Sequence, residues 1–256
     1  AVGPELKATF TLTRDRYAFV SQHIGDMENI ETVEHYDDTL ALYKKLFDVQ
    51  PEVVACDMHP DYHTTRLAAT MGLPVVRVQH HHAHLASVLA EHGLNEPAIG
   101  VIWDGTGYGL DGQIWGGEFL VGDGRGFQRA AHLEYLPLPG GDAATQRPYR
   151  IAWAYLAATL GESASSAIPM SADERAMLSS MLAAGVRVTR TSSVGRLFDA
   201  VSAMLGIRRE VTYEGQAAME LEAVARAGSA SRPYAWDTRR RAGVGGWGKT
   251  DCKVES

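Results

Sequence analysis

Four of the ten histidines in this sequence lie within five positions, in the stretch VQHHHAHLASVLAEHG. Residues four apart share one face of a helix, so His80 and His84 would project side by side. Two imidazoles at this spacing bind one divalent cation, as the histidines of the HExxH motif do. His81 and His84, three apart, are a second pair that the pattern permits. We therefore expect a metal site at the start of a helix, with Zn, Fe, Ni or Co as compatible ions.

A third ligand is expected from the next strand-like segment, AIGVIWD (98–104), which is strongly apolar and ends in Asp104. Two imidazoles are too few to hold a cation, and a carboxylate is a common additional ligand. Asp104 is therefore the natural candidate. For the isolated histidines His92 and His132 we expect no role in chemistry.

Glycines follow Asp104 in the stretch DGTGYGLDGQIWGGEF. Ligands of open α/β folds bind beyond the carboxyl ends of strands, and Gly105, Gly107 and Gly109 would allow a close backbone approach. Their amides, together with Thr106, would form an anion-binding nest for phosphate. The stretch is not a P-loop, because no Lys-Ser/Thr follows. It is not a dinucleotide fingerprint either, because a strand and not a helix comes next.

The elements that must position these residues alternate between strands and helices early in the sequence and are mainly helical later. We expect strands at 8–13, 16–22 (with Arg14-Asp15 at the turn), 51–57, 74–78, 98–104, 113–122 and 127–136. We expect helices at 31–47, 63–73, 80–93, 147–160, 171–185, 194–206 and 214–227. This order predicts α/β layers around a mostly buried mixed sheet.

Composition excludes several classes of protein. The net charge of −7 and the lack of a clustered basic face argue against nucleic-acid binding. No apolar run reaches the roughly 18 residues that a membrane helix needs. The two cysteines, Cys56 and Cys252, form neither a disulfide framework nor a CxxC metal site. With no signal peptide recognisable, we expect a cytoplasmic protein.

Taken together, eight motifs carry a family resemblance. They are GPELKATF, SQHIGDMENIET, ACDMHPDYHTTRLA, VQHHHAH, DGTGYGLDGQIWGGEF, LPLPGGDAA, SSVGRLFDAV and YEGQAAMELE. In this order they resemble the carbamoyl-transfer domain of HypF-type hydrogenase-maturation carbamoyltransferases, over about residues 1–227. The resemblance implies an α/β fold of the actin/Hsp70/sugar-kinase type with two lobes around a nucleotide cleft. The first lobe would span about 1–140 and an incomplete second lobe about 141–227.

The resemblance also implies an activity, cofactors and partners. An upstream domain would make carbamoyl adenylate from carbamoyl phosphate and ATP, with Mg²⁺ accompanying the ATP. The present domain would transfer the carbamoyl group to the C-terminal cysteine thiol of HypE, on the way to the cyanide ligands of NiFe hydrogenase. A divalent Fe or Zn ion would occupy the transfer site. Neither nucleic acid nor a membrane is an expected partner.

Site residues follow from the same resemblance. His80, His84 and Asp104 match the metal ligands, and Lys7 would act with Asp104 in catalysis by meeting phosphate or the carbamoyl oxygen. Ser193, Gly195, Arg196 and Asp199 would open a helix whose amides face phosphate. The other expected substrate or nucleotide contacts are Gly105, Thr106, Gly107, Gly140, Gly141, Asp142, Glu214 and Gly215. No role is assigned to His59, Asp61, His81 or His82, although His59 and Asp61 would suit a turn.

The C-terminal stretch GSASRPYAWDTRRRAGVGGWGKTDCKVES (228–256) departs from the family pattern. We expect it to be an atypical, disordered tail, and neither Asp237 nor Asp251 has the context of a metal ligand. A frameshift, a premature stop or an assembly error would explain the change. We also expect the sequence to be an excerpt from a longer protein that lacks the upstream domains. Such a fragment would retain metal weakly and transfer little.

Other functions remain open at this point. Carbamoylation of a small-molecule hydroxyl and threonylcarbamoyl transfer to tRNA are neighbouring activities. From a different class, the chain would be a non-catalytic remnant that binds only a metal or a partner. A metalloprotease fits poorly, because the sequence has no HExxH motif and Glu91 lies beyond the histidines.

Overall fold

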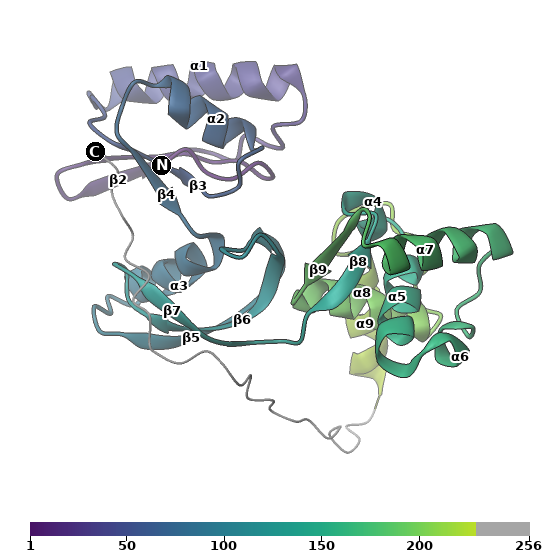
Figure 1. Cartoon of the computed structure of the whole chain (residues 1–256). Coiled ribbons are helices and arrows are strands. Elements are labelled where there is room, and N and C mark those ends of the chain that lie inside the picture. Colours follow the sequence, from purple (N-terminus) through teal and green to yellow (C-terminus); the bar gives the residue numbers. More distant parts are fainter. Residues whose placement is uncertain (229–256) are drawn as a thin grey trace. The chain divides into compact units, whose positions relative to one another are not determined.

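The chain divides into two compact units in the computed structural model, which describes residues 1–228 (Figure 1). The first unit comprises residues 1–93, and the second begins at Leu94. The tail beyond residue 228, with Asp237, Asp251 and Cys252, lies outside the described residues, as does the side chain of Asp142. Each unit is described by itself below.

The first unit combines a β-hairpin with a βαβ segment and two further helices. Its elements are β1 (Thr11–Arg14), β2 (Tyr17–Val20), α1 (Ile30–Leu46), β3 (Val54–Asp57), α2 (His63–Thr70), β4 (Val75–Val78) and α3 (His80–Glu91). Strands β1 and β2 are antiparallel, whereas β3 and β4 are parallel and joined through α2. Because Arg14 pairs with Tyr17, the hairpin turn is Asp15-Arg16. The expected turn at Arg14-Asp15 is therefore wrong by one residue.

Two apolar clusters hold these elements together. In one, the buried ring of Phe10 lies 5.5 Å from that of Tyr36 and 5.1 Å from that of Tyr43, both in edge-on contact. In the other, Val54 and Cys56 of β3 pack with Ala68 of α2, and all three are buried. Buried and half-buried residues alternate along β3, so the strand packs on α2 through one face. This packing holds the position of Asp57, the last residue of the strand.

The second unit contains a mixed sheet and a group of helices. Its elements are β5 (Ala98–Tyr108), β6 (Ile114–Gly122), β7 (Phe127–His132), β8 (Leu136–Pro139), α4 (Asp142–Thr145), α5 (Pro148–Leu160), α6 (Glu162–Ser165), α7 (Ala172–Ala184), β9 (Val188–Thr191), α8 (Val194–Met204) and α9 (Gln216–Ala227). All seven helices expected from the sequence are present. The short elements β8, β9, α4 and α6 were not expected.

Strand β6 organises the sheet of the second unit. It pairs antiparallel with β5 and β7, and it meets β9 in parallel at Ile114 and Thr191. Strand β9 in turn pairs antiparallel with β8. These long-range pairings join residues 94–140 to the segment that follows them. The compact units consequently divide between residues 93 and 94. The lobe boundary expected near residue 140 stays a prediction.

Asp104 does not end its strand, which corrects a further expectation. Strand β5 continues to Tyr108, and its register against β6 shifts between Trp103 and Gly107. Asp104 therefore belongs to a bulge, where an inserted residue changes the direction of a side chain. Of the glycine-rich stretch after Asp104, residues 105–108 continue strand β5, and residues 109–113 form the turn to β6.

Helices α5 and α8 form the core of the second unit. Ile151, Trp153 and Tyr155 of α5 are buried, and α5 packs along α8. On β5, by contrast, Ile99, Val101 and Trp103 are exposed, so this strand is buried on one face and not on both. None of the helices within residues 1–228 has the length and apolar content needed to cross a membrane.

Candidate metal centre

The parallel pair β3–β4 brings the start of α3 to the end of β3. Asp57, the last residue of β3, pairs in register with Val78, the last residue of β4. Helix α3 begins only two residues later, at His80. As a result, Nδ1 of His80 lies 3.2 Å from Oδ2 of Asp57.

Helix α3 is fixed at its first turn by a side-chain cap and along its length by apolar contacts. The side-chain oxygen of Gln79 accepts the amide of His82 at 2.9 Å, which satisfies one of the unpaired donors at a helix start. Leu85 and Leu89 are buried and set the inner face of the helix. His80 and His84 are not part of this inner face: His84 is exposed and His80 is half-buried.

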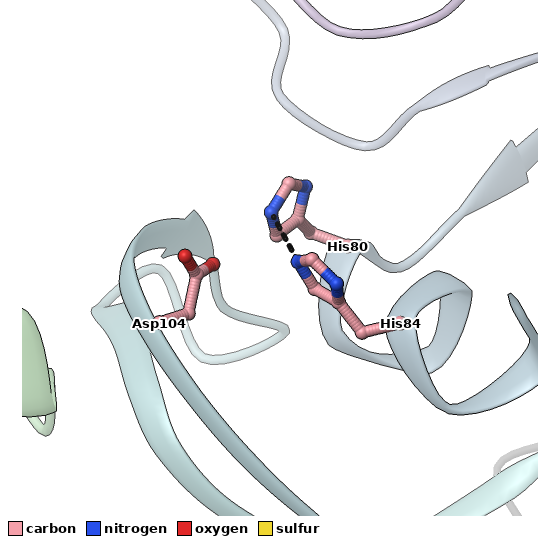
Figure 2. A group of neighbouring side chains, drawn as sticks. All are labelled: His80, His84 and Asp104. Carbon is pink, nitrogen blue, oxygen red and sulfur yellow. Dashed lines mark hydrogen bonds between the residues drawn. The ribbon is translucent and has the colours of Figure 1, made fainter. Parts of the chain in front are cut away.

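The imidazoles of His80 and His84 converge through their Nε2 atoms, which lie 3.3 Å apart (Figure 2). Two nitrogen ligands about 2.0–2.1 Å from one tetrahedral cation would be separated by about 3.3 Å. The spacing of the pair therefore fits shared binding of one ion. Figure 2 also draws Asp104 on its strand.

His81 points elsewhere, which decides between the two histidine pairs that the sequence left open. Its side chain is fully buried, and its Nδ1 lies 3.0 Å from the side-chain Nε2 of Gln79. Its ring centroid is 6.5 Å from that of His84. The converging pair is therefore His80 and His84.

Asp57 contacts the Nδ1 side of the His80 ring, in a polar but largely buried environment. The side chain is 9% exposed, and its Oδ1 accepts the amide of His59 at 2.8 Å. Burial alone would raise the pKa of this carboxyl. The hydrogen bonds from His80 and from the His59 amide outweigh that effect, so the pKa lies below its ordinary value.

His59 and Asp61, to which the sequence assigned no role, hold the turn that follows β3. Nδ1 of His59 accepts the amide of Asp61 at 3.2 Å, and Arg66 donates to the backbone oxygen of Asp61 at 2.7 Å. The ring of His59 also stacks on Tyr62 at 4.2 Å. Their contacts are therefore those of a turn.

In the second unit, the bulge of β5 places Asp104 against the start of α8. Oδ1 of Asp104 accepts the amide of Gly105 at 2.6 Å. Gly107 is buried and pairs with Trp115, whereas Thr106 is exposed. The Gly105 amide is thus engaged by the neighbouring carboxylate, and the phosphate nest expected of these glycines stays a prediction.

Ser193 and Gly195 contact the same bulge. The Ser193 hydroxyl lies within hydrogen-bond distance of the backbone oxygens of Asp104 and Gly105, and it caps α8 by accepting the amide of Arg196. A Cβ on Gly195 would come within 2.8 Å of the Cα of Gly105. The structure therefore brings Ser193 and Gly195 together with Asp104 through backbone contacts.

Arg196 and Asp199, one turn apart on α8, form an ion pair of 2.9 Å with little exposure. Burial raises the pKa of the Asp199 carboxyl, and the nearby guanidinium only partly offsets this. Both charged groups interact electrostatically with Tyr155 of α5.

The remaining expected residues lie on separate elements. Lys7 is exposed, has a φ of 51°, and its amide donates to Asp26. Gly140 and Gly141 have positive φ angles of 93° and 55° at the turn before α4. Glu214 is exposed and Gly215 is half-buried at the N-cap of α9, which packs against α8.

A buried polar network in the second unit escaped the sequence analysis. Glu118 of β6 is fully buried, accepts the Gly116 and Gly117 amides, and pairs with Arg129 of β7 at 2.5 Å. The Arg129 guanidinium lies 3.9 Å above the Trp115 ring. Burial alone would raise the pKa of Glu118. The hydrogen bonds from Arg129 and Ser192 lower this pKa by a larger amount, so the net shift is downward.

Two family models match consecutive parts of the chain. One, described as the HypF Kae1-like domain, matches residues 1–91. The other, described as the carbamoyltransferase Kae1-like domain, second subdomain, matches residues 100–252, which is more than half of the chain. The chain belongs to the HypF carbamoyltransferase family. The second match includes much of the tail that we expected to fall outside the HypF pattern.

Curated HypF proteins are similar along most of the chain. Carbamoyltransferase HypF2 of Cupriavidus necator is 48% identical over 88% of this chain and 28% of its own length. Carbamoyltransferase HypF of Rhizobium leguminosarum bv. viciae is 44% identical over 89% of this chain and 30% of its own length. The chain therefore spans less than a third of these HypF relatives.

Solved HypF structures agree with the fold. A crystal structure of full-length HypF in a phosphate- and nucleotide-bound form has a TM-score of 0.89 and 43% identity, covering 93% of this chain and 32% of that one. The structure of T. kodakarensis HypF has a TM-score of 0.83 and 32% identity, covering 91% and 33%. These likenesses confirm the expected α/β class and the Kae1-like, actin/Hsp70/sugar-kinase type of fold.

Proposed function

We propose that this chain is the carbamoyl-transfer part of a HypF protein. It would move a carbamoyl group from carbamoyl adenylate, made from carbamoyl phosphate and ATP, to the C-terminal cysteine thiol of HypE. The product would supply the cyanide ligands of NiFe hydrogenase. Membership of the carbamoyltransferase family supports the reaction class, and the converging His80–His84 pair supports the location of the site.

We further propose that His80, His84 and Asp104 together hold a divalent Fe or Zn ion. They offer two imidazole nitrogens and one carboxylate oxygen, a donor set that suits either metal. The 3.3 Å separation of the two Nε2 atoms supports the histidine half of this assignment. When bound, such an ion supplies a Lewis acid for a phosphate or carbamoyl oxygen.

The reaction would then depend on how the chain holds its two substrates. The cysteine thiolate of HypE attacks the carbamoyl carbon, a sulfur–carbon bond forms, and the bond from carbon to the phosphate oxygen breaks. AMP leaves with that electron pair. Exposed Lys7 carries a charge suited to the phosphate, and exposed Thr106 offers a hydroxyl. The other proposed substrate or nucleotide contacts are Gly105, Gly107, Gly140, Gly141, Asp142, Ser193, Gly195, Arg196, Asp199, Glu214 and Gly215.

Metal analysis of the purified 256-residue chain, followed by a transfer assay, tests this function. The chain is incubated with carbamoyl adenylate and a peptide of the HypE C-terminus, and the peptide is examined by mass spectrometry. Because a fragment of this kind is expected to retain metal weakly and to transfer little, we expect partial occupancy by Fe or Zn and carbamoylation of a small fraction of the peptide cysteine. A peptide with serine in place of the cysteine, and the His84→Ala chain, serve as controls.

The same assay distinguishes the alternatives. Metal binding without carbamoylated peptide contradicts thiol transfer and supports a metal-binding remnant. Carbamoylation of a small-molecule hydroxyl, or threonylcarbamoyl transfer to tRNA, in place of peptide modification would assign the chain to a neighbouring activity.

A further inference from the structure

We propose that Asp57 is a positioning residue for the metal centre: its carboxylate holds His80 in the tautomer and orientation in which Nε2 binds the ion. The inference rests on the proposed metal site and adds a residue to it. It depends on the 3.2 Å contact between Asp57 Oδ2 and His80 Nδ1. With Nδ1 facing Asp57, the other ring nitrogen, Nε2, faces His84.

The contact fixes which ring nitrogen carries the proton. An ionised carboxylate only accepts hydrogen bonds, so Nδ1 of His80 must donate to Asp57. In the neutral imidazole, the lone pair then resides on Nε2. That atom is the one that faces Nε2 of His84 at 3.3 Å. Asp57 thus selects the tautomer that a metal requires at this position.

Asp57 is itself held firmly enough to act in this way. Its Oδ1 accepts the His59 amide at 2.8 Å, and its backbone oxygen accepts the hydroxyl of buried Thr65 at 3.2 Å. The strand register with Val78 fixes its distance from α3. The carboxylate is therefore anchored by β3, by the turn after it and by α2.

Asp57 is not suited to be a ligand of the same ion. Its Oδ2 lies on the Nδ1 side of the His80 ring, whereas the converging nitrogens are Nε2 atoms. The two nitrogens of an imidazole direct their lone pairs or protons outward along different directions. A carboxylate behind a ligating histidine orients the ring and raises its basicity without touching the metal.

The first measurement uses the unaltered, metal-free chain at neutral pH. Long-range ¹H–¹⁵N NMR reports which nitrogen of His80 carries the proton, with the His80→Gln chain used to assign the signals. We expect the Nδ1–H tautomer. A predominant Nε2–H tautomer would overturn the inference without any assumption about metal or activity.

The second measurement compares the affinity of variants for Co²⁺, whose visible absorption reports the ligand geometry. Removing the carboxylate in Asp57→Ala should weaken binding about 10–100-fold, the range typical for such outer partners. The isosteric Asp57→Asn chain should show a smaller loss and an altered spectrum. Asp61→Asn, an exposed acid four residues away on the same turn, is the matched control and should bind like the unaltered chain.

The outcomes separate this inference from the proposed function. If His80→Ala and His84→Ala weaken Co²⁺ binding but both Asp57 variants bind normally, Asp57 has no positioning role and the metal site stands. If the unaltered chain binds no Co²⁺, the metal site fails and the inference fails with it. Circular dichroism of Asp57→Asn at the temperature of the titration confirms that the chain remains folded.

Discussion

The hydroxyl of Ser193 lies 2.5 Å from the backbone oxygen of Gly105 and 3.0 Å from that of Asp104. The same hydroxyl oxygen accepts the amide of Arg196 and so caps helix α8. One buried side chain therefore joins the start of a helix to the bulge that carries a proposed metal ligand. Several expected effects of substitution depend on close contacts of this kind.

Replacing Ser193 with alanine should destabilise the second unit by about 1–3 kcal/mol, from the loss of a helix cap and of a buried hydrogen bond. Ser171→Ala removes the cap of α7, whose hydroxyl accepts the Glu174 amide, and is the matched control. Urea unfolding of both chains gives the two free energies. Equal losses would show that the contact with β5 contributes nothing.

Gly195→Ala should also be destabilising, although alanine is the better helix former by about 1 kcal/mol. The new Cβ would lie 2.8 Å from the Cα of Gly105 and 3.3 Å from the oxygen of Asp104, so α8 would have to move away from β5. Gly124, around which a Cβ meets nothing within 4 Å, supplies the control Gly124→Ala. Thermal unfolding should show a lower Tm for the first variant alone.

The buried pair Glu118–Arg129 should make stability depend on pH in acid. Because the folded pKa of Glu118 lies below the reference value of 4.5, its stabilising contribution is complete above that pH. The contribution is lost as the pH falls through the folded pKa. Glu118→Gln should cost about 3–5 kcal/mol at neutral pH, since it leaves Arg129 buried without its partner charge.

Urea unfolding at a series of pH values from neutral to acid checks this expectation. The free-energy difference between the unaltered chain and Glu118→Gln should shrink as the pH falls below 4.5. Glu96→Gln, at an exposed position, is the control for the loss of one carboxylate. A difference that stays constant with pH would contradict the proposed role of the ionised pair.

His84→Ala should weaken Zn²⁺ binding by at least a factor of ten, because it removes one of two nitrogens that converge at 3.3 Å. His92→Ala, at the exposed C-cap of the same helix, should leave the affinity unchanged. Calorimetric titration with Zn²⁺ measures both. An equal loss in the two variants would indicate nonspecific histidine binding.

Helical periodicity predicted α3, and the cluster of histidines predicted two possible pairs, of which His80 and His84 converge in the structure. Local patterns did not reveal that β5 passes through Asp104, because the bulge arises from pairing with β6 and from contact with Ser193. The four-residue strands β8 and β9 also escaped prediction. Two prolines interrupt β8, and β9 is defined by partners far away in the sequence.

Asp57 was within reach of sequence reasoning but was missed. It ends an apolar strand, as Asp104 was expected to do, and the strand that precedes the histidines is its parallel neighbour. The carboxyl ends of parallel neighbours meet at one edge of a sheet, which is sufficient to suggest contact with His80. Glu118 gave no such signal, because a carboxylate within a strand is usually exposed.

The in-register pairing of Asp57 with Val78 has a consequence for how the folding of the first unit can be followed. A slip of β3 by a single residue would turn Asp57 to the opposite side of the two-stranded ribbon and take its carboxylate away from His80. At a limiting concentration, a coloured ion such as Co²⁺ would then bind mainly to molecules whose strands are aligned correctly. The absorbance of such an ion during refolding would make strand alignment visible in real time.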